Sequence, residues 1–415
     1  MLDIKFIREN VDRVKRGVVD KQLDPSLIDK VLELDKKRRD LLGETERLRA
    51  ERNELSSKEH VVNSRGKEIK DELKRLEPKL REVEEEYKKA LYQIPNIPAD
   101  DVKVGKDESE NEVIHKWGEP RDFSKDGFEP KDHLVLGEAL DIVDVKRATK
   151  VSGTRFGYIK GDAVLLEFAL VQFALETLIK ESFTPIVPPT LIKKESMARM
   201  GYLEHGGEED MYVLEKDNLV LVGTAEQSVG PMHGGELLKA ESLPKRYVAF
   251  SSSFRREAGS YGKDTRGILR VHQFDKVEMF SYTKPEESDK EHEYLLGLEK
   301  KLWQALGIPY QVVKMCTGDL GAPATRKYDL EAWIPSQNKY REVTSASTCT
   351  DFQSRRLNIK YQDGGEKKFV HTLNGTAFAI GRTLIAIMEN YQQKDGSIIV
   401  PEALTKWVGK EKIIA

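Results

Sequence analysis

The first hundred residues carry two series of apolar positions at helical spacing. The first is a leucine at every seventh position with mostly charged residues between: Leu27, Leu34, Leu41, Leu48 and Leu55. After the polar stretch SSKEHVVNSRG, the second series advances in alternating steps of four and three: Ile69, Leu73, Leu76, Leu80, Val83, Tyr87 and Ala90. Each series forms one apolar side of a helix. Two such helices with a short connection bury these sides against each other or against a partner, which predicts an antiparallel helical hairpin.

The helical period ends in the segment QIPNIPADDVKVGKDESENEV. This segment contains Pro95 and Pro98 followed by acidic residues, and it shows neither a helical nor a strand period. Such a composition indicates a linker. We therefore expect an N-terminal domain over residues 1–100, a linker over 101–130 and a second domain over 131–415.

The second domain alternates between strand-like and helix-like runs. Strand-like runs include DNLVLVG, KRYVAFSSSF and ILRVHQFDKVEMF, and helix-like runs include AVLLEFALVQFALETLIKE and TAFAIGRTLIAIMENYQQ. Several strands follow one another through short loops, which favours pairing between sequence neighbours over a doubly wound parallel sheet. We predict an α+β fold: an antiparallel β-sheet flanked by helices, with the helical coiled-coil arm at the N-terminus.

Composition excludes several classes of protein. The 415 residues have a formal net charge of −3, so any contact with nucleic acid would need a local basic patch. Cys316 and Cys349 are the only cysteines and lack metal-ligand spacing, which argues against a disulfide framework or structural zinc. No apolar run approaches the roughly 20 residues of a membrane span. We expect a soluble, intracellular protein with no membrane association.

The stretch FRREAGSYGKDTRGILRVHQFDKVEMF, residues 254–280, gathers charged groups around a glycine-rich loop. Alternate residues of an extended strand face the same way. Before the loop, Arg255 and Glu257 would share a face, with Arg256 on the other. After the loop, one face would hold a further set: Arg270, His272, Phe274 and Glu278.

This face combines three kinds of group that suit a nucleotide. Guanidinium groups match phosphate, a phenyl ring offers a stacking surface, and carboxylates accept from an amine. Phe274 and Glu278 would lie roughly 13 Å apart at about 3.3 Å per residue, which would fit a base at one end and an amine at the other. The loop fails the P-loop pattern, because Asp264 follows Lys263. An exposed β-hairpin with cross-strand ion pairs remains an alternative.

Several motifs together resemble the class II aminoacyl-tRNA synthetases. FRREAG followed by RVHQFDKVEMF is similar to motif 2 of that class, FTPIVPP at 183–189 to motif 1, and NGTAFAIGRTLIAIMENYQ at 374–392 to motif 3. The sequences TAE at 224–226 and REVTSASTCTDFQSRR at 341–356, with the N-terminal hairpin, resemble the seryl-tRNA synthetase family. The resemblance covers essentially the full length.

The resemblance implies a role for each matching residue. Phe274 and Arg382 would sandwich adenine, and Arg255 would hold the α-phosphate and the amino-acid carboxylate. The residues implied for ATP are Arg255, Arg256, Glu257, Arg270, Val271, Phe274, Glu342, Val343, Thr344, Ser345 and Arg382. Those implied for serine are Thr224, Ala225, Glu226, Arg255, Glu278 and Thr376. Glu342 and Ser345 would also bind Mg²⁺.

The implied activity has two steps. Serine and ATP give seryl-adenylate, and the adenylate acylates the 3′ end of tRNA(Ser), with tRNA(Sec) left open as a second substrate. The resemblance also implies a cytoplasmic homodimer whose N-terminal hairpin grips tRNA. On charge alone the hairpin is an ordinary solvated coiled coil, because acidic residues nearly balance its basic ones.

Two other functions remain as alternatives. One is a synthetase-derived ligase that loads an amino acid onto a carrier protein, although such relatives tend to lack the arm. The other is a coiled-coil interaction protein with an inactive catalytic domain, which ought to have lost charged site residues that this chain retains.

Three positions depart from the family pattern. Ser182 stands where motif 1 often has glycine, which bears on packing rather than chemistry. TSASTC replaces the commoner SSCSN but keeps Ser345, and Thr376 replaces a serine, which adds a methyl group to the expected serine pocket.

Overall fold

The computed structural model describes residues 1–57, 64–258 and 266–415. The chain divides into two compact units, Met1–Ile97 and Pro98–Ala415. The domain boundaries predicted above, at residues 100 and 130, remain a proposal.

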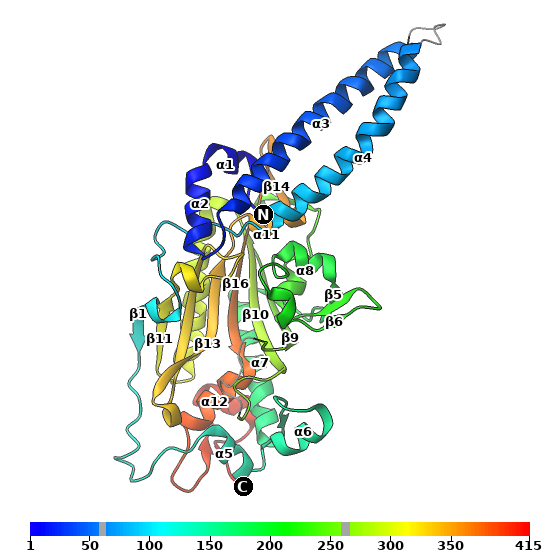
Figure 1. Ribbon diagram of the computed structural model, residues 1–415. Helices are drawn as coiled ribbons and strands as arrows, with labels where there is room; N and C mark the ends of the chain where they lie inside the picture. Colours follow the sequence, from blue (N-terminus) through cyan, green and yellow to red (C-terminus); the bar gives the residue numbers. More distant parts are fainter. Residues whose placement is uncertain (58–63, 259–265) are drawn as a thin grey trace. The chain divides into compact units, whose positions relative to one another are not determined.

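The described part of the first unit consists of short and long helices (Figure 1). The short helices are α1, Ile4–Glu9, and α2, Val11–Asp20. The long helices are α3, Ser26–Ser57, and α4, Ser64–Tyr92. They pack side by side and exchange ion pairs between Arg49 and Glu77 and between Arg65 and Glu51, which confirms the predicted helical hairpin.

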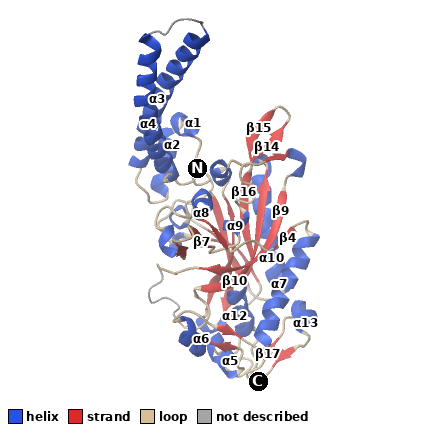
Figure 2. Cartoon of the chain, turned by 90° about the vertical axis from the view of Figure 1, so that its right-hand side faces the viewer, coloured by secondary structure: helices blue, strands red, loops and turns tan. Residues whose placement is uncertain are grey.

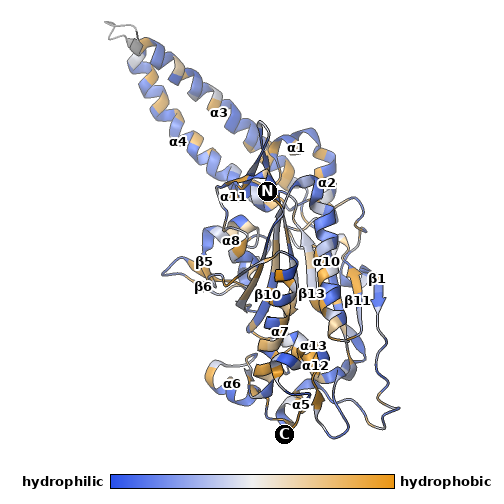
Figure 3. Cartoon of the chain, turned by 180° about the vertical axis from the view of Figure 1, so that it is seen from behind, coloured by the Kyte–Doolittle hydropathy of each residue, from blue (hydrophilic) through white to orange (hydrophobic). Residues whose placement is uncertain are grey.

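The two apolar series meet along the contact between α3 and α4. Leu48 and Ile69 are fully buried there, Leu73 and Leu76 nearly so, and Leu41 packs against them. Apolar positions recur at intervals along both helices among hydrophilic ones (Figure 3). Helical stability of such a thin arm therefore comes mainly from this narrow contact.

The second unit is built on an eight-stranded sheet in the order β1-β11-β12-β13-β16-β10-β9-β4. The bounds of its strands are β1 Glu112–Trp117, β4 Thr184–Ile186, β9 Lys245–Phe254, β10 Gln273–Thr283, β11 Tyr310–Lys314, β12 Arg326–Ile334, β13 Lys339–Thr348 and β16 His371–Ala379. All neighbours are antiparallel except β4 and β9. The predicted α+β class and antiparallel sheet are confirmed.

Helices α7, Asp162–Lys180, and α10, Ser288–Ala305, lie along one side of this sheet (Figure 2). Glu181 joins them by accepting from Tyr294 and Lys301. Helix α12, Ile380–Asn390, and helix α13, Glu402–Val408, complete the main core. Trp303 and Phe378 are fully buried in it, with ring centroids 6.1 Å apart.

Smaller elements surround the sheet. The short helices are α5 His133–Ala139, α6 Val145–Ser152, α8 Lys194–Met200, α9 Glu226–Val229 and α11 Phe352–Leu357. The other strands are β2 Val143–Asp144, β3 Tyr158–Ile159, β5 Leu191–Lys193, β6 Val213–Leu214, β7 Leu219–Leu221, β8 Leu237–Lys239, β14 Lys360–Asp363, β15 Glu366–Phe369, β17 Ile398–Ile399 and β18 Lys412–Ile413.

Two local features differ from the simplest interpretation of the sequence. The segment predicted as a linker supplies β1, which pairs with β11 at the sheet edge, and it also buries Val102 and Phe123. The helix-like run from residue 376 begins as strand, because β16 pairs with β10 as far as Ala379. Apolar runs of this length do not by themselves distinguish a buried strand from a helix.

Ser182 adopts a backbone φ of +66° between α7 and β4. This left-handed region costs little for glycine and more for other residues, which explains why the related motif often has glycine here. The turn redirects the chain from the helix to the edge strand.

Both cysteines are buried, as free thiols. Among the described residues, no helix combines the length and apolar content that crossing a bilayer requires.

Candidate active site

A cavity opens at the middle of the sheet, where β13, β16 and β10 are neighbours. Its wall combines charged, aromatic and apolar side chains: Arg255, Glu257, Ile268, Leu269, Arg270, Val271, Phe274, Lys276, Glu342, Val343, Thr344, Ser345, Thr376, Ala379, Gly381 and Arg382. The antiparallel pairing of these strands thus brings together segments that are far apart in the sequence.

Most residues predicted for ATP line this cavity. They come from four segments: the backbone that follows β9, the stretch that leads into and begins β10, strand β13, and helix α12. Arg256 is the exception, because its guanidinium lies 5.7 Å from the ring centroid of Tyr212 and is outside the cavity wall.

The prediction that these residues lie on regular strands was wrong at several positions. β9 ends at Phe254 and β10 begins at Gln273, so Arg255, Glu257 and Arg270 lie on irregular backbone. Glu257 has a φ of +54°, which an extended strand excludes. Individual hydrogen bonds and ion pairs, rather than a regular strand, bring these side chains together.

Arg255 is held from both ends. Its Nε donates to the carbonyl oxygen of Gly223 at 3.1 Å, and its guanidinium lies 5.4 Å from the Phe274 ring centroid. Its backbone amide donates to the carbonyl of His272 at 3.0 Å, and the imidazole Nδ1 donates back to the Arg255 carbonyl at 2.9 Å. The described segments on either side of residues 259–265 are therefore held together at the cavity.

Two further arginines pair with carboxylates of the wall. Arg270 donates to Glu257 at 3.1 Å, and Arg382 donates to the carboxylate and the backbone carbonyl of Glu342 at 2.9 and 3.0 Å. Partial removal from water would raise the pKa of Glu342, but the charges of Arg382 and Lys327 lower it to about 2. This carboxylate is ionised at neutral pH.

The residues predicted for serine lie deeper and are linked to the cavity wall through Lys276. The ammonium of Lys276 pairs with Glu278 and donates to the hydroxyl of Thr224 at 3.2 Å. Thr376 donates to Glu278 at 3.3 Å. Of the predicted set, Arg255 and Thr376 line the cavity itself, whereas Thr224, Ala225, Glu226 and Glu278 are buried behind its wall.

Glu226 accepts hydrogen bonds from neutral side chains. Tyr202 donates its hydroxyl, and Asn374 donates its amide at 2.9 Å. Burial and the negative charge of Glu278 raise the pKa of Glu226 to about 7. A third carboxylate, Glu299, is fully buried nearby and accepts from Thr344 at 3.0 Å, and burial raises its pKa well above the ordinary value.

Five further residues of this region were not predicted as site residues: Lys276, Tyr202, Asn374 and the apolar wall residues Ile268 and Leu269. Lys276 could have been predicted, because it is two residues from both Phe274 and Glu278 and therefore lies on the same face of the strand. Asn374 begins the motif 3 sequence. Tyr202 carries no local signal, because its contact with Glu226 depends on the packing of α8 near α9.

We predict that Glu226 makes stability depend on pH. Its ordinary pKa of 4.5 applies in the unfolded chain, so between pH 4.5 and about 7 the folded protein binds more protons. The contribution of this group to the free energy of unfolding is present below that window and is lost as the pH rises through it. Glutamine does not titrate, so Glu226→Gln lacks this pH dependence. The free energy of unfolding of the variant, relative to that of wild type, should therefore rise by up to about 3 kcal/mol across the window.

The measurement is denaturant unfolding of both proteins at several pH values. Glutamine keeps an acceptor for Asn374, so packing changes little. Stability curves that stay parallel from pH 4.5 to about 7 would contradict the raised pKa.

Comparisons with known proteins agree with this geometry. The family described as "Seryl-tRNA synthetase N-terminal domain" matches residues 1–98, and the "tRNA synthetase class II core domain (G, H, P, S and T)" matches residues 212–391. The chain is 46% identical to the serine--tRNA ligase of Dictyoglomus turgidum and 45% identical to that of Rubrobacter xylanophilus. Both alignments cover 100% of this chain and 99% of the relative.

Solved structures give the same result. The seryl-tRNA synthetase from Pyrococcus horikoshii, complexed with ATP, is 41% identical with a TM-score of 0.92, covering 100% of this chain and 99% of that one. The cytoplasmic serine-tRNA ligase from Naegleria fowleri, in complex with AMP, is 34% identical with a TM-score of 0.89, covering 100% and 98%. The chain therefore belongs to the serine--tRNA ligase family of class II aminoacyl-tRNA synthetases, as its sequence motifs predicted.

Proposed function

We propose that this enzyme activates serine with ATP in the central cavity and transfers it to the 3′ end of tRNA(Ser). The observation that carries the proposal is the convergence of Arg255, Phe274 and Arg382, from three separate segments, on one cavity. A serine carboxylate is already a nucleophile. Catalysis then consists of aligning the reactants and neutralising phosphate charge, which arginines can supply.

In the proposed complex adenine stacks between Phe274 and Arg382, Arg382 also reaches the γ-phosphate, and Arg255 contacts the α-phosphate. The adenine amine donates to Glu257, while Arg270 adds a phosphate contact. Both arginine–carboxylate pairs of the wall would then exchange a carboxylate for a phosphate partner, a substitution that keeps the guanidinium charge neutralised. Val271, Val343 and Thr344 also line the cavity, and Arg256 would reach the nucleotide from outside its wall.

Glu342 and Ser345 would hold Mg²⁺. Both line the cavity and offer oxygen ligands, and Glu342 is ionised at neutral pH. Among the described residues no three Asp, Glu, His or Cys side chains gather into a metal site, so phosphate oxygens would complete the coordination. When bound, the ion would supply charge neutralisation at the phosphates.

Serine would bind among Thr224, Glu226, Glu278 and Thr376, beside Ala225. The carboxylates of this group would accept from the substrate ammonium and hydroxyl. Alanine would leave a buried acceptor without its donor, which costs far more than the loss of one apolar contact. Threonine would be excluded by size, since Thr376 already contributes a methyl group to this pocket.

The hairpin of α3 and α4 would bind tRNA(Ser), with tRNA(Sec) as a second candidate. Double-stranded RNA exposes phosphates and shape rather than base edges to side chains, which suits a long exposed arm with many basic residues. Such contacts weaken with salt. A carrier-protein ligase without this arm is less consistent with the match over residues 1–98.

We also propose a cytoplasmic homodimer formed through motif 1. Apolar side chains are exposed on α7 and beside β4, which is an edge strand of the sheet: Leu165, Phe168, Ile179 and Val187. A second copy covering this face would bury them.

The activity proposal predicts a large loss on removal of either arginine. Arg255→Ala and Arg382→Ala should each reduce serine-dependent ATP–pyrophosphate exchange by about 10²-fold or more, because each removes a fixed donor from the phosphates. Arg147→Ala, which removes an exposed arginine outside the cavity, is the matched control. Near-normal exchange in Arg255→Ala, or activity with amino acids other than serine in wild type, would refute the assignment.

The arm proposal predicts a separation of the two steps. Deleting residues 30–90 should spare pyrophosphate exchange, since none of these residues lines the cavity, but it should greatly weaken aminoacylation of tRNA. The assay compares both rates in the same preparation at low and high salt. Unchanged aminoacylation by the deleted protein would show that the arm does not bind tRNA.

The dimer proposal predicts that a charge on α7 produces monomers. Phe168→Glu places a carboxylate in the proposed interface, whereas Val151→Glu changes an exposed apolar residue on α6. Light scattering after size-exclusion chromatography should give a monomer for the first and a dimer for the second. The proposal fails if Phe168→Glu remains dimeric or if the wild type is monomeric.

A further inference from the structure

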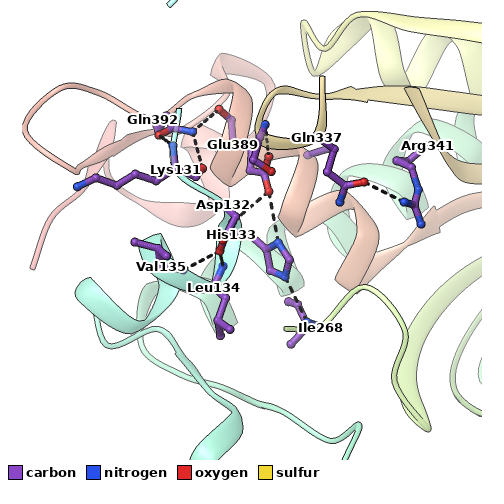
Figure 4. A network of polar contacts seen from close by, with 12 residues as sticks. Lys131, Asp132, His133, Leu134, Val135, Ile268, Gln337, Arg341, Glu389 and Gln392 are labelled. Carbon is purple, nitrogen blue, oxygen red and sulfur yellow. Dashed lines mark hydrogen bonds and ion pairs between the residues drawn. The ribbon is translucent and has the colours of Figure 1, made fainter. Parts of the chain in front are cut away.

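A polar network that reaches the cavity wall at Ile268 joins three segments of the second unit (Figure 4). At its centre is His133, the first residue of α5, which is 6% exposed. Its imidazole lies between the carboxylate of Glu389, near the end of α12, and the backbone amide of Ile268. These partners are 256 and 135 residues away in the sequence.

The contacts determine which imidazole nitrogen carries the proton. The amide of Ile268 donates to Nε2 at 3.3 Å, so Nε2 must be an acceptor. Nδ1 then carries the hydrogen and donates to Glu389 at 3.3 Å. The backbone amide of His133 donates to the same Glu389 oxygen at 3.0 Å, which fixes the imidazole relative to α12.

Gly267 leaves room for this contact. It has a φ of +75°, and a Cβ atom built on it would lie 2.1 Å from Nε2 of His133. A side chain at this position would therefore displace the imidazole from the Ile268 amide. The backbone here both requires the left-handed region and approaches His133 closely, which are two separate reasons for glycine.

Both partners of His133 belong to segments that form the cavity. Ile268 lines it and is followed by Leu269 on the same wall. Glu389 lies on the helix that carries Arg382, and its second oxygen accepts from the amide of Ser336 at 3.0 Å, in the turn that leads into β13. One fully buried carboxylate thus joins the two segments that carry Arg382 and Glu342.

We propose that His133 is a positioning residue for the nucleotide. It fixes the wall segment at Ile268 relative to α12, so that the apolar wall and Arg382 keep the spacing that an adenine ring needs. This inference rests on the proposed assignment of the cavity to ATP. It predicts an effect on ATP binding with little effect on serine, because the serine residues contact neither His133 nor Glu389.

Substitution of His133 by asparagine and by glutamine tests the contacts of its two imidazole nitrogens one at a time. In His133→Asn the amide can still donate to Glu389 from the place of Nδ1 but cannot reach Ile268. In His133→Gln the amide oxygen can reach the place of Nε2 and accept from Ile268. The KM for ATP in pyrophosphate exchange should rise about tenfold in His133→Asn, the effect of leaving a buried amide without its acceptor, and should return to near wild type in His133→Gln.

The KM for serine is the internal control and should change by less than about twofold in both variants. Equal KM values for ATP in the two variants, or parallel shifts for both substrates, would refute a positioning role. If wild type shows no serine-dependent exchange, the proposed function fails instead.

A second measurement does not depend on activity. Hydrogen exchange of the Ile268 amide should accelerate in His133→Asn and stay slow in His133→Gln. Unchanged protection in His133→Asn would overturn the proposal. Should His133→Asn fail to fold, Gly267→Ala disturbs the same contact from the other side, and it should likewise raise the KM for ATP alone.

Discussion

The pairing of β10 with β16 is the constraint on which the site depends. It sets Glu278 opposite Thr376 and Phe280 opposite Asn374, which brings the motif 2 strand against the motif 3 strand. The register shifts between Val277 and Glu278, because β16 has one extra residue at this point. This extra residue changes the direction of the side chains that follow it. A slip of this register would turn the residues proposed for serine away from those proposed for ATP.

Ion pairs hold the cationic side chains of the site in place before a ligand binds. Arg382, Arg270 and Lys276 each pair with a carboxylate of the site, and such pairs offset part of the cost of removing the charges from water. The deeper region holds Glu226, Glu278 and Glu299, whose nearest cation is Lys276. An arriving ammonium group would add a second positive charge there. The ammonium group of a zwitterionic amino acid would therefore suit a region in which burial alone would favour protonated carboxyls.

The parts of the molecule that sequence predicted are those with local periodicity. The hairpin follows from the spacing of Leu48, Ile69 and their repeats, and Phe274 and Glu278 follow from alternation along a strand that does form. Arg255 and Glu257 were placed by the right motif but the wrong geometry, because β9 ends before them. The contacts of Tyr202 and His133 join segments far apart in the chain, so no window of sequence contains them.

Irregular backbone at the cavity has a physical consequence of its own. Strand residues are positioned by the hydrogen bonds of the sheet, whereas residues 255–258 and 266–272 have no such ladder. Their amides are paired individually: Arg255 with the His272 carbonyl, Arg256 with the Asp210 carbonyl, Ala258 with the Asp210 carboxylate, His272 with the Arg155 carbonyl, and Ile268 with the His133 imidazole. Three of these acceptors are main-chain carbonyls, which any substitution preserves. The other two are side chains, so these two hydrogen bonds depend on the identities of Asp210 and His133. Ile268 lines the cavity and Ala258 does not, which makes His133 the position at which a substitution most directly alters the cavity wall.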